Sequence, residues 1–92
     1  MGQHLPLETL LEKRAEIEQR LKVGDCFRHY KNQHIYRIHS LALREEDDTV
    51  SVNYQDENSG LIFNRKADIF LEQVKGKDGK MVNRFEHVKE VK

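Results

Sequence analysis

The chain has 92 residues, with 16 Lys and Arg against 16 Asp and Glu, so its formal net charge is zero when the histidines are neutral. A chain of this length makes one domain and buries only about 60–65% of the surface that its unfolded form exposes. A neutral charge balance does not indicate a global attraction to nucleic acid or to an anionic membrane. The composition therefore predicts one small domain and argues against a large catalytic cavity.

A single cysteine, Cys26, excludes an internal disulfide and suits a reducing compartment. No apolar stretch has the length of a signal peptide or of a membrane span. We therefore expect a cytoplasmic protein that makes no membrane contact.

An amphipathic helix is predicted at residues 6–22, after a short tail at residues 1–5. Pro6 suits the first helical position, and Gly24 suits the point just after the helix. The apolar stripe of this helix consists of Leu7, Leu10, Leu11, Ile17 and Leu21. Such a stripe must be buried, either on the same chain or on a second copy. The very short linker that follows favours the same chain, and so a monomer over a helix-mediated homodimer.

After Gly24 the apolar period changes to two, which predicts β-strands packed with the helix as one domain over residues 24–92. Strands are expected at residues 25–30, 35–43, 50–54 and 61–65, one helical turn at 66–70, and a hairpin of 71–74 with 81–87 around an Asp-Gly turn. Residues 35–43 are apolar on both sides, which indicates a central strand or a bulge near Ser40. The predicted fold is mainly β (α+β): a small, partly open antiparallel barrel of five or six strands, of the Src-homology-3-like kind.

The predicted core combines alternate strand positions with aromatic residues near strand centres. Its members are Phe27, Tyr36, Ile38, Val50, Val52, Tyr54, Phe63, Phe70, Val74 and Phe85. Ile69 is also expected to turn inward with Phe70.

The segment 25–38 places a cation, an imidazole and a phenol at the end of its first strand. Cations outnumber acids in residues 22–37 and 75–92, whereas acids dominate residues 44–57, so a local basic face can exist on a neutral protein. Interleaved aromatic residues on such a face can stack bases or hold an anion. The candidate ligand-binding residues are Arg28, His29, Tyr30, Tyr36, Glu46, Arg65, Arg84 and Phe85.

The type and spacing of thirteen residues along the chain resemble the sequence pattern of a known family. They are Gly24, Arg28, His29, Tyr30, Lys31, Tyr36, Glu46, Tyr54, Arg65, Phe70, Glu72, Arg84 and Phe85. Through these matches, residues 24–87 resemble the bacterial family catalogued as domain of unknown function 1653. The chain departs from that pattern at Phe27, Asn32, Arg44, Asp47, Phe63 and Lys66. The resemblance implies a compact β domain and a bacterial source, and it implies no reaction.

Three functions stay open at this point. The first is a non-enzymatic binding module whose basic and aromatic groove takes a peptide, a nucleic-acid segment or a small anion. The second is a small enzyme or enzyme accessory that uses His29 as a base on an anionic substrate. The third is a structural or assembly role through the helix. Against any binding role, Arg65 and Arg84 can instead form structural ion pairs with Glu46 and Glu72.

No metal, cofactor or catalytic residue is predicted. Structural zinc sites need ligands in pairs at short spacing, and the sequence has no such pairs. The Gly76–Gly79 turn lacks the Ser or Thr and the helix of a phosphate-binding loop. Cys26 is expected to be a buried core thiol.

Overall fold

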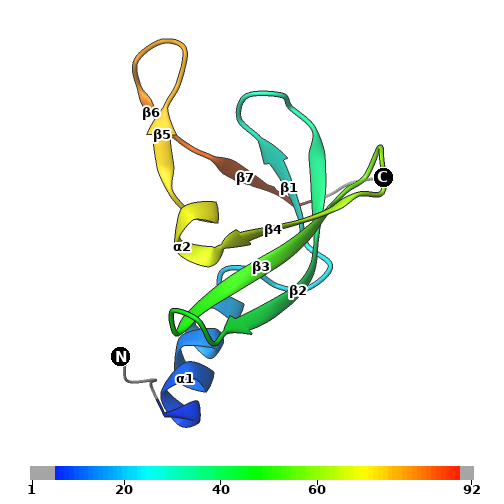
Figure 1. The fold of residues 1–92 in the computed structure, drawn as a ribbon. Helices are drawn as coiled ribbons and strands as arrows, with labels where there is room; N and C mark the ends of the chain where they lie inside the picture. The colour runs from blue at the N-terminus through cyan, green and yellow to red at the C-terminus, as the bar shows by residue number, and fades with distance from the viewer. Residues whose placement is uncertain (1–5, 90–92) are drawn as a thin grey trace.

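The computed structural model describes residues 6–89. It consists of an N-terminal helix, a five-stranded antiparallel sheet and a separate two-stranded hairpin (Figure 1). In chain order the elements are α1 Leu7–Glu18, β1 Cys26–His29, β2 Ile35–Arg44, β3 Thr49–Asp56, β4 Ile62–Lys66, α2 Ala67–Phe70, β5 Gln73–Lys75, β6 Met81–Asn83 and β7 Phe85–Val88. The prediction of a mainly β domain with an N-terminal helix is confirmed.

The predicted barrel is wrong, because the sheet does not close. Its strand order is β4-β3-β2-β1-β7, so β4 and β7 are two open edges. The stretch 81–87, expected as one strand, breaks at Arg84, whose N–H donates to Glu72 O (3.0 Å) and whose C=O accepts from Tyr30 N (3.0 Å). The residues before Arg84 therefore pair with β5, while those after it pair with β1, and the chain cannot return to β4.

A bulge in β2 explains why this strand is apolar on both sides. Its register with β3 shifts between Ile38 and Ser40, as the sequence predicts. Tyr36 and Ile38 face the core before the bulge, and Leu41 and Leu43 pack against the core after it. One extra residue thus switches the face that the strand buries, and β2 is also the central strand of the sheet.

The helix α1 ends earlier than predicted, at Glu18, and packs against β2 and β3. The next residues form a tighter turn, in which Arg20 N donates to Ile17 O (2.9 Å). This turn brings Leu21 into the core, where it is fully buried. Gly24, with φ +93°, then directs the chain into β1. Of the apolar stripe, Leu10, Ile17 and Leu21 meet the sheet, while Leu7 and Leu11 remain exposed.

The core lies between one face of the sheet, α2 and the segment that follows α1. Eight of the predicted core residues are buried: Phe27, Tyr36, Ile38, Val50, Val52, Tyr54, Phe70 and Phe85. Phe70, on the one-turn helix α2, stacks on Phe85 with ring centroids 3.9 Å apart. The prediction was wrong for Phe63 and Ile69, which are 42% and 37% exposed, and for Val74, which is only half-buried. Phe63 sits on edge strand β4, and Val74 belongs to the two-stranded hairpin outside the sheet, so neither is covered on both sides.

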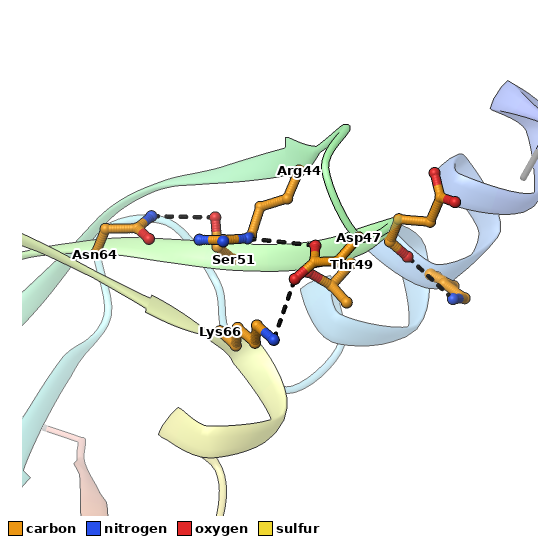
Figure 2. Close-up of polar contacts among 8 residues, drawn as sticks. Arg44, Asp47, Thr49, Ser51, Asn64 and Lys66 are labelled. Atoms are coloured by element: carbon orange, nitrogen blue, oxygen red, sulfur yellow. Dashed lines mark hydrogen bonds and ion pairs between the residues drawn. The ribbon is translucent and has the colours of Figure 1, made fainter. Parts of the chain in front are cut away.

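The acidic turn between β2 and β3 is fastened to its neighbours (Figure 2). Asp47 accepts a hydrogen bond from Thr49 Oγ1 (2.6 Å) and forms ion pairs with Lys66 Nζ (3.1 Å) and Arg44 Nε (3.4 Å). The hydrogen bonds from Thr49 and Lys66 lower the pKa of Asp47 to about 2. This carboxylate therefore ties the turn to the end of β4.

Candidate functional site

Six of the eight predicted site residues line two hollows on opposite faces of β1. Successive side chains of a strand alternate between its faces, so Arg28 cannot share a face with His29. The smaller hollow, here called the cup, has a volume of about 220 Å³ and is lined by His29, Asn32, Tyr36, Tyr54, Phe63, Arg65 and Phe85. The larger hollow, here called the trough, has a volume of about 980 Å³ and lies between the β1–β2 turn and the hairpin β5–β6 (Figure 1).

Aromatic rings form the floor and walls of the cup. Tyr36, Tyr54 and Phe85 are buried and pack edge to face, with ring centroids 5.4–5.8 Å apart. The half-exposed Phe63 lies beside Tyr54, at 5.9 Å between centroids. The ring of His29 stands edge-on to Phe85 at 4.9 Å. These contacts join all five strands of the sheet, so the cup is held by the sheet itself rather than by a loop.

The polar atoms that border the cup are mainly hydrogen-bond donors. Tyr36 Oη already accepts from Asn32 Nδ2 (3.2 Å), and Tyr54 Oη accepts from Arg65 Nε (3.3 Å). Because each phenol oxygen is occupied as an acceptor, its own proton is left to donate. Among residues 6–89, no carboxylate lines the cup. A cavity of this kind favours a ligand with acceptor atoms and negative charge.

His29 is fixed as a further donor. Its Nδ1 accepts a hydrogen bond from the backbone N–H of Lys31 (3.1 Å), so the proton of the neutral ring lies on Nε2. Burial, and then the nearby cations Arg65, Arg84 and Lys31, lower the pKa of His29 below its usual 6.5. The imidazole is therefore neutral at pH 7 and presents an N–H, within a positive local field.

Arg65 and Arg84 differ in their partners. Arg84 Nη2 forms an ion pair with Glu72 Oε2 (3.0 Å), which is the pairing that the structural alternative predicts for this arginine. Arg65 has no carboxylate partner among residues 6–89, and its hydrogen bond to Tyr54 uses only Nε. The expected pairing with Glu46 is wrong, because Glu46 lies exposed on the β2–β3 turn and lines neither hollow.

The trough contains more cations than the cup, but they lie among acids, and Arg84 lines neither hollow. Arg28 and Tyr30 line the trough, together with three lysines from the turn and the hairpin, Lys31, Lys75 and Lys77. Arg28 Nη1 lies 3.6 Å from Glu86 Oε1, and Asp78 is also part of the lining. The charge of the trough is therefore partly compensated within the chain.

The sequence thus predicted four members of the cup, namely His29, Tyr36, Arg65 and Phe85. It missed three others as site residues. Tyr54 and Phe63 were assigned to the core. The available signal was that Phe63 and Arg65 lie two residues apart on one strand, and so on the same face of it, while Tyr54 lies on the neighbouring strand. Asn32 gave no signal, since its role follows from the shape of the β1–β2 turn, where Gln33 has φ +63°.

Other chemistry has less support in the fold. Cys26 is buried, as predicted, and burial raises the pKa of its thiol, which disfavours the reactive thiolate. Over residues 6–89, no three His, Cys, Asp or Glu side chains gather closely enough to hold a metal ion. Neither described helix has the length and apolar character needed to cross a membrane.

Comparison with known proteins gives one finding. No curated protein and no solved structure shows significant similarity to the chain. The family described as protein of unknown function (DUF1653) matches residues 25–87, which include every residue of both hollows. The chain therefore belongs to the DUF1653 family.

Proposed function

We propose that the domain is a binding module without catalytic chemistry of its own, and that its cup receives a small anionic group. The observation that carries this proposal is the composition of the lining, which within residues 6–89 offers several donors and a guanidinium without a carboxylate partner, but no acid. A carboxylate or another oxyanion would supply the acceptors that these donors lack.

The size of the cup limits what enters it. A volume of about 220 Å³ is below the roughly 300–1,000 Å³ of sites that enclose a drug-sized ligand. The cup has room for an oxyanion with one planar or short apolar group, which the rings of Tyr54 and Phe63 would contact. A whole nucleotide would extend far outside it.

The hydrogen bond to His29 Nδ1 favours binding over proton abstraction. A general base needs a free lone pair, and in the neutral ring the only lone pair is the one that Lys31 N–H occupies. His29 is thus prepared to donate from Nε2. This is the role expected of a ligand-binding residue beside an anion.

Benzoate and acetate are suitable probes, followed by NMR at low ionic strength. We expect benzoate to shift the Arg65 Nε–Hε and Asn32 side-chain signals, with weak affinity in the millimolar range, and acetate to bind more weakly. The variant Arg65→Gln should lose this binding while its melting temperature stays close to that of the wild type. Arg28→Gln, which changes the trough, is the matched control and should bind benzoate normally. Equal shifts in the wild type and in Arg65→Gln would refute the proposal.

A further inference from the structure

The edge strand β4 has backbone groups that no other part of the described chain uses. Asp56 N donates to Leu61 O (2.9 Å), and this bond shows which residues of β3 and β4 face one another with their backbone N–H and C=O groups. In an antiparallel pair, hydrogen-bonded residues recur at every second position. Phe63 and Arg65 therefore direct their N–H and C=O groups to β3. The N–H and C=O of Ile62 and Asn64 therefore point outward. No backbone hydrogen bond outside the ladders involves them within residues 6–89.

Only part of this edge carries the protection that exposed edges usually have. Proteins shield edge strands with charges, proline or bulges, because an open edge pairs with other chains. The second half of β4 carries Arg65 and Lys66, but the first half and the residue before it expose three consecutive large apolar side chains: Leu61, Ile62 and Phe63. The opposite edge, β7, exposes Glu86 and His87. Of the two edges of the sheet, β4 is the one suited to receive a strand.

The face of β4 that carries Phe63 and Arg65 is continuous with the cup. Both side chains line the cup, and they are two residues apart on the same side of the strand. On a strand added beside β4, the residues opposite Phe63 and Arg65 would form the closely spaced, non-hydrogen-bonded pairs, with Cα atoms about 4.5 Å apart. Side chains at those two positions would reach the cup directly.

We propose that β4 binds an extended peptide by strand addition, and that an acidic side chain of this peptide enters the cup and pairs with Arg65. The inference rests on the proposed function, since the anion in the cup would be a carboxylate side chain of the bound peptide. It also specifies a spacing: the acid lies opposite Arg65 and an apolar residue opposite Phe63, with one residue between them. Main-chain hydrogen bonds to Ile62 and Asn64 would add affinity that a free carboxylate lacks.

A second copy of the chain is a less suitable occupant of the same edge. The strand β4 itself, Ile62–Lys66, contains Arg65 and Lys66 but no acid. Pairing two β4 strands would bring cations into the cup instead of a carboxylate. Charge complementarity thus favours a foreign acidic peptide over self-association.

Selection from a library of random octapeptides on phage tests the recognition rule. We expect the enriched peptides to share an acid with an apolar residue two positions away. Enrichment should be lost on Arg65→Gln and kept on the trough variant Arg28→Gln. Four outcomes would each overturn the inference. They are enriched peptides without an acid, equal enrichment on Arg65→Gln, no enrichment at all, and a concentration-dependent dimer that masks the edge.

Backbone methylation of an enriched peptide tests strand addition itself. N-methylation of the amides that face β4 should weaken binding at least tenfold, whereas methylation of the alternate amides should leave it almost unchanged. The bound peptide should also slow hydrogen exchange at the Ile62 and Asn64 amides. Equal effects of the two methylation patterns would overturn strand addition.

The failures of the two proposals are distinguishable. If benzoate binds the cup but no peptide is selected, only the strand-addition inference fails. A second outcome is that benzoate does not bind, while a peptide slows exchange at Ile62 and Asn64 equally in the wild type and in Arg65→Gln. In that case the proposed anion site fails, and with it the pairing of a peptide acid with Arg65.

Discussion

The cup and the trough are built from neighbouring residues of the β1–β2 segment, yet they differ in how their charge is balanced. The trough is several times larger and contains more cations, but Glu86 and Asp78 lie among them. Of the described residues, those lining the cup include one guanidinium and no acid, and the phenol oxygens are occupied as acceptors. The proposed binding site therefore rests on unbalanced donor groups over an aromatic floor and not on the size of the hollow.

The aromatic core beneath the cup should dominate stability. Phe70 is fully buried and stacks on Phe85, so Phe70→Ala should lower the free energy of unfolding by about 3–5 kcal/mol. Phe63→Ala is the matched control on the wall of the cup and should cost roughly 1 kcal/mol or less, because that ring is half-exposed. Urea unfolding measures both. Similar losses in the two variants would contradict the assignment of Phe70 to the core and of Phe63 to the wall of the cup.

The two arginines near His29 should separate structural from binding roles. Arg84→Met removes the ion pair with Glu72 that helps hold the hairpin base to the sheet, and should cost up to about 1 kcal/mol. Arg65→Met should cost less, since no carboxylate in the described chain loses a partner. Hydrogen exchange should show faster opening of β5 and β6 only in Arg84→Met. Faster exchange of the hairpin in Arg65→Met instead would reverse the assignment.

The protonation of His29 should report the field in the cup. Because its pKa is lowered in the folded state, the unfolded chain takes up the proton more readily, and stability should fall as the pH drops below about 6.5. Ring signals in NMR should give a pKa below 6.5 in the free protein and a higher one with benzoate bound, because an anion stabilises the imidazolium. A pKa that benzoate leaves unchanged would place the anion elsewhere. His39, exposed on β2, serves as the internal control.

The smallest effect is expected at the acidic turn, away from both hollows. Asp47 has a pKa of about 2, below its ordinary value of 3.8, so the stability that it contributes is present above pH 4 and is lost as the pH falls toward 2. Asp47→Asn should reduce this acid dependence without affecting benzoate binding. An acid-unfolding profile identical to that of the wild type would show that the ion pairs of this turn contribute nothing measurable.

Local patterns predicted the elements well. The period-two stretches, the Asp-Gly hairpin and the bulge near Ser40 were all visible in the sequence, because they depend on neighbouring residues. Arg28 and His29 lie on opposite faces of β1 because they are consecutive residues of a strand, which the sequence alone could have shown. The groove predicted from the sequence nevertheless placed both on one surface. The helix end was less predictable, since the turn after Glu18 depends on burying Leu21 against the sheet.

The sequence by itself determined the class of domain, most of the aromatic core and the family. Only the tertiary structure decided which strands pair, and so where the sheet stays open. The break at Arg84 depends on backbone partners on Glu72 and Tyr30, and no local pattern encodes such contacts. The same non-local pairing gave Arg84 a carboxylate and left Arg65 without one in the described chain. The character of the candidate site follows from that difference, because the partner of a charge depends on the positions that folding brings together.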